Sequence, residues 1–120
     1  MTDELPVLDE GVLADLRASV GGDEAFVRDL VATFVAEEPT NLELVVAAAA
    51  AGDAEAIVRP AHTLKSSAGA IGAARLSAIS REIEFAGREG RTADLAPLAE
   101  KAQRAWSETL GALRVAGLVP

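Results

Sequence analysis

The stretch IVRPAHTLKSSAGAIGA, residues 57–73, carries the apolar periodicity of an α-helix. Its apolar side chains recur at spacings of four, three and four residues, the pattern of one buried helical face: Ile57, Ala61, Leu64 and Ala68. Asp53 can cap the start of this helix. Pro60 removes one backbone hydrogen bond inside the pattern, and Gly69 with Gly72 predicts a break or a sharp kink. The stretch therefore predicts a core-facing helix that is interrupted at these glycines.

The rest of the chain also predicts helices, because Ala, Leu, Glu and Arg dominate and no alternating β-branched pattern occurs. Glycines separate the helical segments, and aspartates precede several of them. Residues 24–51 are interpreted as one long helix bent near Pro39, with two separate helices as the alternative. The other helices are predicted at about 9–20, through 76–86 with an end at Gly90, and at about 93–115.

Four long amphipathic helices with short connections predict an all-α fold, an up-and-down antiparallel four-helix bundle. The additional short N-terminal helix is expected to lie across one end of the bundle. A chain of 120 residues suits a single domain, residues 1–120, and its ordered core is expected at about 8–115 with frayed ends.

Composition excludes several classes of protein. A net charge of −8 argues against nucleic acid and anionic membranes as partners, since both require a basic surface. The longest apolar run, LVVAAAAA at 44–51, has eight residues, whereas a bilayer span needs roughly 20. The start MTDELPVLDE lacks the apolar region of a secretory signal, and the absence of cysteine excludes disulfides. We therefore expect a cytoplasmic protein.

The only histidine, His62, falls on a flank of its helix rather than on the apolar face, because it is rotated by about 100° from Ala61. Its own face holds the residues at spacings of three, four and seven: Val58, Lys65, Ser66 and Gly69. An exposed neutral imidazole is a nucleophile, and a cation one turn away suits a phosphoryl group on the ring. A lone helical histidine is nevertheless more often a plain polar surface residue.

These residues resemble the signature of histidine-containing phosphotransfer (HPt) domains, which reads roughly H-x-L-K-G-S, a few small residues, then G-A. Here the motif is HTLKSS at 62–67, followed by GA at 72–73. The segment LDEGVLADLRASVGGDEAFVRDLVATF at 8–34 is similar to the family's first two helices, and IE at 83–84 matches an apolar-Glu pair. Ser66 stands where the family most often has glycine.

The resemblance implies a monomeric phosphoryl carrier that is not an autonomous kinase. It makes His62 the phosphoacceptor and Lys65 the residue that neutralises the phosphate, while Ser66 and Gly69 leave room for a partner. The implied partners are response-regulator receiver domains and a sensor or hybrid histidine kinase. No cofactor is implied for this chain, because the receiver domain supplies Mg²⁺.

The long helix predicted at 24–51 has more apolar residues than a core stripe requires: Phe26, Val27, Leu30, Val31, Phe34 and Val35. Most of them are expected in the core. One edge is a candidate docking patch near His62, to which we assign Phe34 together with Val58. The acidic pair at 37–38 is interpreted as a solvated face.

Three other functions compete with a phosphoryl carrier. An autophosphorylating histidine kinase usually has an acidic residue after the histidine, where this chain has Thr63, and it needs an ATP-binding domain. The phosphoacceptor domain of a chemotaxis-type kinase would look similar but would head a longer polypeptide. A helical adaptor would have no chemistry. Acid–base catalysis finds no support, since Glu82 and Glu84 point in different helical directions.

Overall fold

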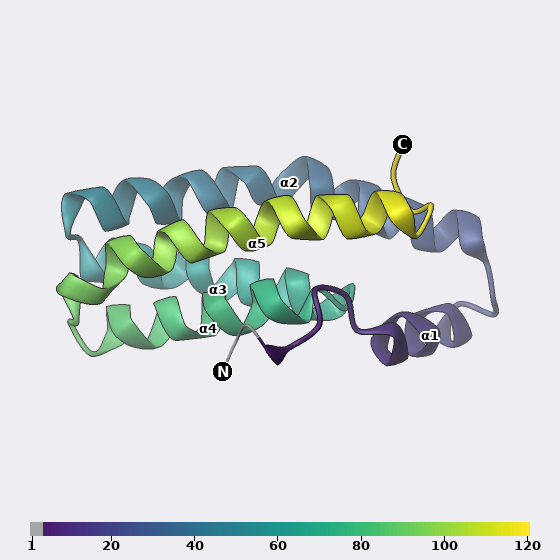
Figure 1. Cartoon of the computed structure of the whole chain (residues 1–120), viewed down its shortest axis with the longest axis horizontal. Coiled ribbons are helices and arrows are strands. Elements are labelled where there is room, and N and C mark those ends of the chain that lie inside the picture. Colours follow the sequence, from purple (N-terminus) through teal and green to yellow (C-terminus); the bar gives the residue numbers. More distant parts are fainter. Residues whose placement is uncertain (1–3) are drawn as a thin grey trace.

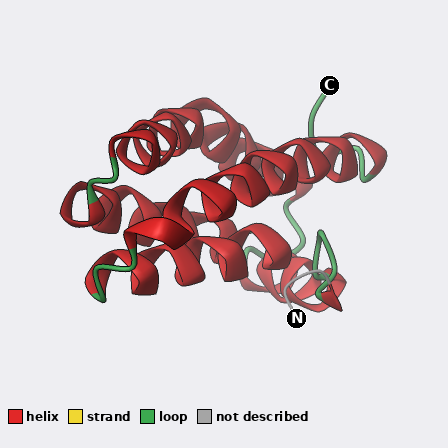
Figure 2. Cartoon of the chain, turned by 60° about the vertical axis from the view of Figure 1, so that its left-hand side comes forward, coloured by secondary structure: helices red, strands yellow, loops and turns green. Residues whose placement is uncertain are grey.

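The helices predicted from the sequence are present in the computed structural model, which describes residues 4–120 (Figure 1). Figure 2 shows that the ordered elements in this part of the chain are all helical, which confirms the all-α prediction. The elements are α1 at Glu10–Ser19, α2 at Glu24–Ala51, α3 at Ala54–Ala70, α4 at Ala74–Arg88, the short 3₁₀ helix η2 at Thr92–Asp94, and α5 at Leu95–Val115.

Helix α2 continues through Pro39 without interruption, so the single long helix is confirmed and the alternative of two helices is wrong. Helix α3 likewise continues through Pro60. A proline inside a helix costs about 3 kcal/mol or more. Tertiary packing supplies most of the stability of helices in proteins. In α3 the Pro60 side chain is itself buried, so its packing helps to offset the cost of the lost backbone hydrogen bond.

Aspartate side chains cap the first three helices, as the sequence predicts. Oδ1 of Asp9 accepts a hydrogen bond from the backbone N–H of Gly11 at 2.9 Å. Asp23 and Asp53 accept equivalent bonds at the starts of α2 and α3, at 3.1 Å and 3.0 Å. Such a cap contributes about 1 kcal/mol to helix stability.

The four long helices form a bundle in which α3 and α4 lie side by side, with α2 and α5 packed along them (Figure 1). Helix α1 lies at one end of the bundle, as expected. The backbone N–H of Asp9 holds it there by donating to the carbonyl oxygen of Gly72 at 2.7 Å. Gly72 can end α3 because its φ of 82° suits glycine alone. No helix within residues 4–120 has the length and apolarity that crossing a bilayer requires.

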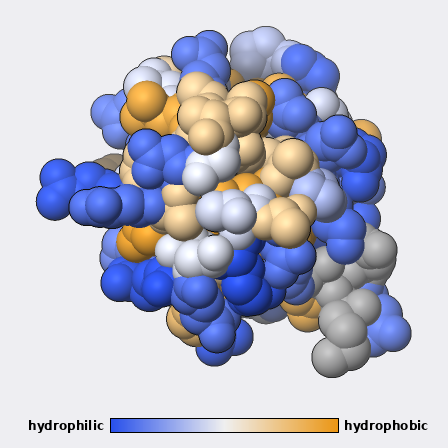
Figure 3. All heavy atoms as spheres, turned by 90° about the vertical axis from the view of Figure 1, so that its left-hand side faces the viewer, coloured by the Kyte–Doolittle hydropathy of each residue, from blue (hydrophilic) through white to orange (hydrophobic). Residues whose placement is uncertain are grey.

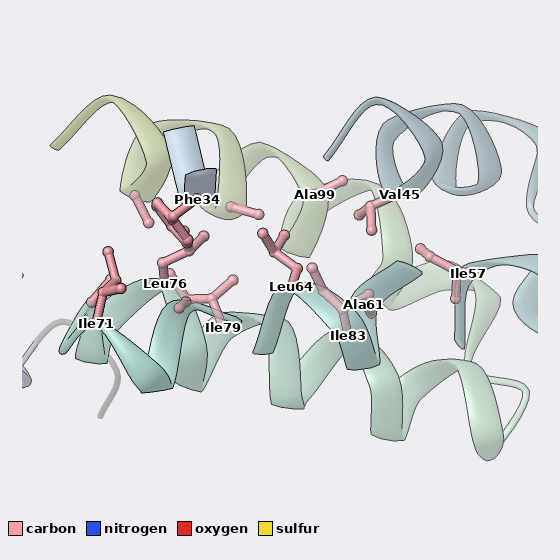
Figure 4. Packing of buried hydrophobic residues seen from close by; sticks show 14 of the residues in the cluster. Phe34, Val45, Ile57, Ala61, Leu64, Ile71, Leu76, Ile79, Ile83 and Ala99 are labelled. Carbon is pink, nitrogen blue, oxygen red and sulfur yellow. The ribbon is translucent and has the colours of Figure 1, made fainter. Parts of the chain in front are cut away.

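The core is formed by aliphatic side chains from all four long helices (Figure 4). It contains the whole stripe predicted on α3, namely Ile57, Ala61, Leu64 and Ala68. Partners from the other helices include Val45 of α2, Leu76, Ile79 and Ile83 of α4, and Ala99 of α5. Each fully buried leucine or isoleucine contributes about 1.5–3 kcal/mol of hydrophobic stabilisation.

The ordered part of the chain was expected to cover about residues 8–115, but hydrogen bonds extend beyond both of these limits. The carbonyl oxygen of Leu5 accepts bonds from the Arg75 side chain at 3.1 Å and 2.9 Å. At the other end, the backbone N–H of Leu118 bonds the carbonyl oxygen of Leu113 at 2.9 Å, and Leu118 is buried. Part of the segment expected to fray, residues 1–3, lies outside the described residues.

The end of the bundle that carries the α2–α3 and α4–α5 connections shows weakly apolar surface surrounded by hydrophilic residues (Figure 3). Four alanines at the end of α2 and around the start of α5 are exposed: Ala50, Ala51, Ala93 and Ala96. His62, by contrast, lies midway along α3.

Candidate functional site

The His62 side chain lies on the solvent-exposed flank of α3 and is 54% exposed. The residues directly before it and two positions after it, Ala61 and Leu64, are fully buried. The helical rotation that separates these positions therefore keeps the imidazole ring outside the core, as the sequence predicts.

A buried carboxylate on the neighbouring helix contacts the ring. Glu84 of α4 is 3% exposed, and its Oε2 lies 3.1 Å from Nδ1 of His62. From the sequence, Glu84 was predicted only as the acidic member of the apolar-Glu pair and as an unsuitable acid–base partner of Glu82, so its contact with His62 was not predicted. Glu84 is four residues after Ser80 and three before Gly87, and this spacing on one face of α4 beside the apolar stripe is the signal that could have predicted its burial.

Two cations hold the same carboxylate. Nζ of Lys65 donates to Oε1 of Glu84 at 2.8 Å. Arg88, one turn after Glu84 on α4, donates to Oε2 from Nη2 at 2.7 Å and from Nε at 3.1 Å. Glu84 is therefore the shared partner of two residues of α3 and one residue of α4.

Glu84 is ionised throughout the pH range in which a histidine titrates. Burial by itself would raise the pKa of Glu84, but hydrogen bonds from Lys65, Arg88 and His62 lower it from 4.5 to about 2. An ionised carboxylate can only accept hydrogen bonds, so Nδ1 of His62 must carry the proton. In the neutral ring, the lone pair is then on Nε2.

Close packing of α3 against α4 brings Glu84 to His62. The hydroxyl of Ser77 on α4 donates to the carbonyl oxygen of Lys65 at 2.9 Å. One turn beyond Glu84 on α4, Gly87 lies against the start of α3. A Cβ at this glycine would lie 2.7 Å from Cγ2 of Ile57. The two helices can therefore approach closely on both sides of Glu84 because the α4 residues there are small.

The four residues expected to contact a partner, by giving it room or by docking it, differ in their exposure. Ser66 and Gly69 are exposed on the same flank of α3 as His62, and Val58 is half-buried. The structure does not bring Phe34 onto this surface, since Phe34 is 4% exposed and its ring packs 5.3 Å from that of Trp106. Phe34 therefore contributes little exposed surface beside His62, although its side chain lines a groove together with Ser67.

The acidic pair of α2 is not simply a solvated face. Glu37 is exposed, but Glu38 is 3% exposed and accepts a hydrogen bond from Nδ2 of Asn41 at 3.1 Å. The prediction is therefore wrong for Glu38, because this position of α2 turns towards the bundle interior. Both carboxylates line a groove of about 210 Å³, which Ser67 of α3 also lines.

The comparisons with known proteins agree with this geometry. The family model for the Hpt domain matches residues 29–116 of the chain. Among solved structures, the chain is similar to histidine-containing phosphotransfer protein B (HptB) from Pseudomonas aeruginosa PAO1, with 34% sequence identity and a TM-score of 0.77. The match covers 87% of this chain and 88% of HptB. No curated protein matches the sequence.

Proposed function

The chain belongs to the Hpt domain family, and from this premise we propose that it carries a phosphoryl group on Nε2 of His62. Its general function is that of a histidine phosphotransfer protein in two-component phosphorelays. Proteins of this kind are phosphoryl carriers rather than autonomous kinases.

The observation that carries the assignment of His62 is the contact between its Nδ1 and the ionised, buried carboxylate of Glu84. This contact keeps the proton on Nδ1 and leaves the Nε2 lone pair available for attack on phosphorus. The ring is also accessible, since it is more than half exposed.

Phosphoryl transfer from an aspartyl phosphate forms the bond between Nε2 and phosphorus and breaks the bond between phosphorus and the aspartyl oxygen. The donor aspartate leaves as a carboxylate, while the Nδ1 proton stays in place. The phosphorylated ring then carries a positive charge, which the Glu84 carboxylate stabilises by charge-assisted hydrogen bonding. Lys65 supplies the positive charge that neutralises the phosphoryl oxygens.

The partners of this site are response-regulator receiver domains and a sensor or hybrid histidine kinase. Ser66 and Gly69 leave space beside the ring for the loops that carry the partner aspartate. Mg²⁺ is expected on the receiver domain, and no cofactor is expected on this chain. A monomeric carrier would present His62 to each partner in turn.

Incubation with a phosphorylated receiver domain tests the proposal. We expect acid-labile, base-stable phosphate on the wild-type chain and none on His62→Gln, whose fold should be unchanged because the ring lies outside the core. Labelling of the glutamine variant would show that the site is wrong. Labelling of the wild type by ATP alone would indicate an autokinase, and no labelling by either donor would indicate an adaptor.

A further inference from the structure

We infer that Arg88 is a positioning residue that holds Glu84 while Lys65 moves from this carboxylate to the phosphoryl group on His62. The inference rests on the proposed function of His62 and concerns how its positive surroundings are shared. Lys65 and Arg88 both bind the Glu84 carboxylate in the unphosphorylated protein, but only Lys65 would move during transfer.

Lys65 cannot serve the carboxylate and the phosphoryl group from one position. Its Nζ lies 2.8 Å from Oε1 of Glu84, and Glu84 lies on the Nδ1 side of the His62 ring. A phosphoryl group on Nε2 projects from the opposite side of the five-membered ring. Neutralising the phosphoryl oxygens therefore requires the ammonium group to leave Glu84. A lysine side chain can make this movement because its ammonium group is carried on a flexible stem of four carbons.

Glu84 would lose a partner in this step, and a buried carboxylate without a compensating charge is costly. Arg88 removes this cost because it binds Glu84 twice, through Nη2 at 2.7 Å and Nε at 3.1 Å. Both residues belong to α4 and are four positions apart, so their contact does not depend on the movement of α3 side chains.

The changes in charge during transfer favour the exchange. Before transfer, when the ring is in its neutral, nucleophilic form, the Glu84 carboxylate faces two cations and an uncharged imidazole. When the bond between Nε2 and phosphorus forms, the ring becomes cationic with its proton still on Nδ1, and the group on Nε2 is a dianion. The ring cation then occupies one side of Glu84, where it repels the ammonium of Lys65, while the dianion attracts it.

A double-mutant cycle tests this coupling directly, with Lys65→Ala, Arg88→Gln and the double variant of the full chain. The rate of His62 phosphorylation by phosphoramidate is followed by ³¹P NMR, because this donor requires no protein docking. Arg88→Gln is expected to be about fivefold slower, since Lys65 must then remain at Glu84. Introduced into the wild type, Lys65→Ala should slow phosphorylation by about tenfold or more. Introduced into the Arg88→Gln variant, the same substitution should slow it by less than about twofold.

Two further variants separate this role from loss of surface charge or of packing. Arg81 lies on the same helix, one turn before Glu84, and stacks on the Phe85 ring 4.9 Å away without a bond to the carboxylate. Arg81→Gln removes the same charge and should change the rate less than about twofold. Arg88→Lys keeps one charged donor for Glu84 and should restore most of the rate and of the coupling to Lys65.

The outcomes decide between the inference and the proposed function. If Lys65→Ala slows the reaction by the same factor with Arg88 and with Gln at position 88, the two cations act independently and the inference is overturned. An Arg81→Gln variant as slow as Arg88→Gln would also overturn it. A wild-type chain that takes no phosphate on His62 from phosphoramidate or from a phosphorylated receiver would instead overturn the proposed function.

Discussion

Nδ1 of His62 on α3 lies 3.1 Å from Oε2 of Glu84 on α4, although the two residues are 22 positions apart in the sequence. The contact joins an exposed ring to a buried carboxylate and so determines which ring nitrogen holds the proton. The availability of the Nε2 lone pair for phosphorylation follows from this contact.

Glu84→Gln is predicted to loosen the control of the ring tautomer. The amide oxygen can still accept a hydrogen bond from Nδ1, but it carries no charge and its NH₂ group can instead donate to the ring. We expect a larger share of the tautomer protonated on Nε2 and phosphorylation by phosphoramidate slower by about tenfold. ¹⁵N NMR of the imidazole measures the first and ³¹P NMR the second. A wild-type tautomer ratio in the variant would contradict the assigned role of Glu84.

Stability should fall as acid protonates Glu84. The pKa of Glu84 is lowered by folding from 4.5 to about 2, so the ionised form stabilises the folded state at pH values above 4.5. This stabilisation is lost as the pH falls from 4.5 towards 2, and it amounts to about 3 kcal/mol in full. Urea unfolding of the wild type and Glu84→Gln should show a difference in the free energy of unfolding that shrinks as the pH falls from 4.5 towards 2. An unchanged difference at pH 3 would contradict the prediction.

Ser66→Gln should obstruct a protein donor but not a small one. Ser66 is exposed one turn beyond His62 on the same flank, where a receiver must approach the ring. Transfer from a phosphorylated receiver is expected to fall by about tenfold or more, while labelling by phosphoramidate stays within about twofold of wild type.

Ser66→Gly is the matched control for this prediction, because it removes the side chain and should keep both rates, with a helix-propensity cost below about 1 kcal/mol. Equal loss with both donors in Ser66→Gln would mean that Ser66 acts on the ring itself. Equal retention would mean that the partner docks elsewhere.

Gly87→Ala should destabilise the bundle by about 1–3 kcal/mol. The added Cβ would lie 2.7 Å from Cγ2 of Ile57 and 2.8 Å from the carbonyl oxygen of Ala54, which forces α3 and α4 apart. Gly111→Ala on α5 is the matched control, since a Cβ there meets nothing within 4 Å. Its expected effect is a gain of up to about 1 kcal/mol from helix propensity. Urea unfolding measures both, and a neutral Gly87→Ala would show that the helix contact is not tight.

The sequence alone determined the features that depend on neighbours along one helix. The caps at Asp9, Asp23 and Asp53 were predictable because a cap bonds the backbone two or three residues later. The exposure of His62 and the position of Lys65 one turn away were predictable because 3.6 residues make a helical turn. This periodicity also predicts the buried stripe of α3.

Only the tertiary structure decided which side chains from other helices complete the site. The rotation and spacing of α4 against α3 depend on packing at Ser77 and Gly87, and they bring Glu84 and Arg88 to His62 and Lys65. Helical periodicity defines the angle of a side chain about the axis of its own helix, but not its distance from a second helix. It therefore cannot predict a contact between positions 62 and 84.

The long helix α2 illustrates the same limit. The apolar residues at 26, 30 and 34 and those at 27, 31 and 35 form two neighbouring stripes in the sequence, but the pattern does not show which edge faces the core. The structure buries Phe34 against Trp106 and turns Glu38 inwards, whereas Phe26 stays 46% exposed. On a helix with apolar residues on both stripes, the sequence pattern does not distinguish these orientations, and contacts with α1, α3 and α5 select one of them by burying the larger apolar area.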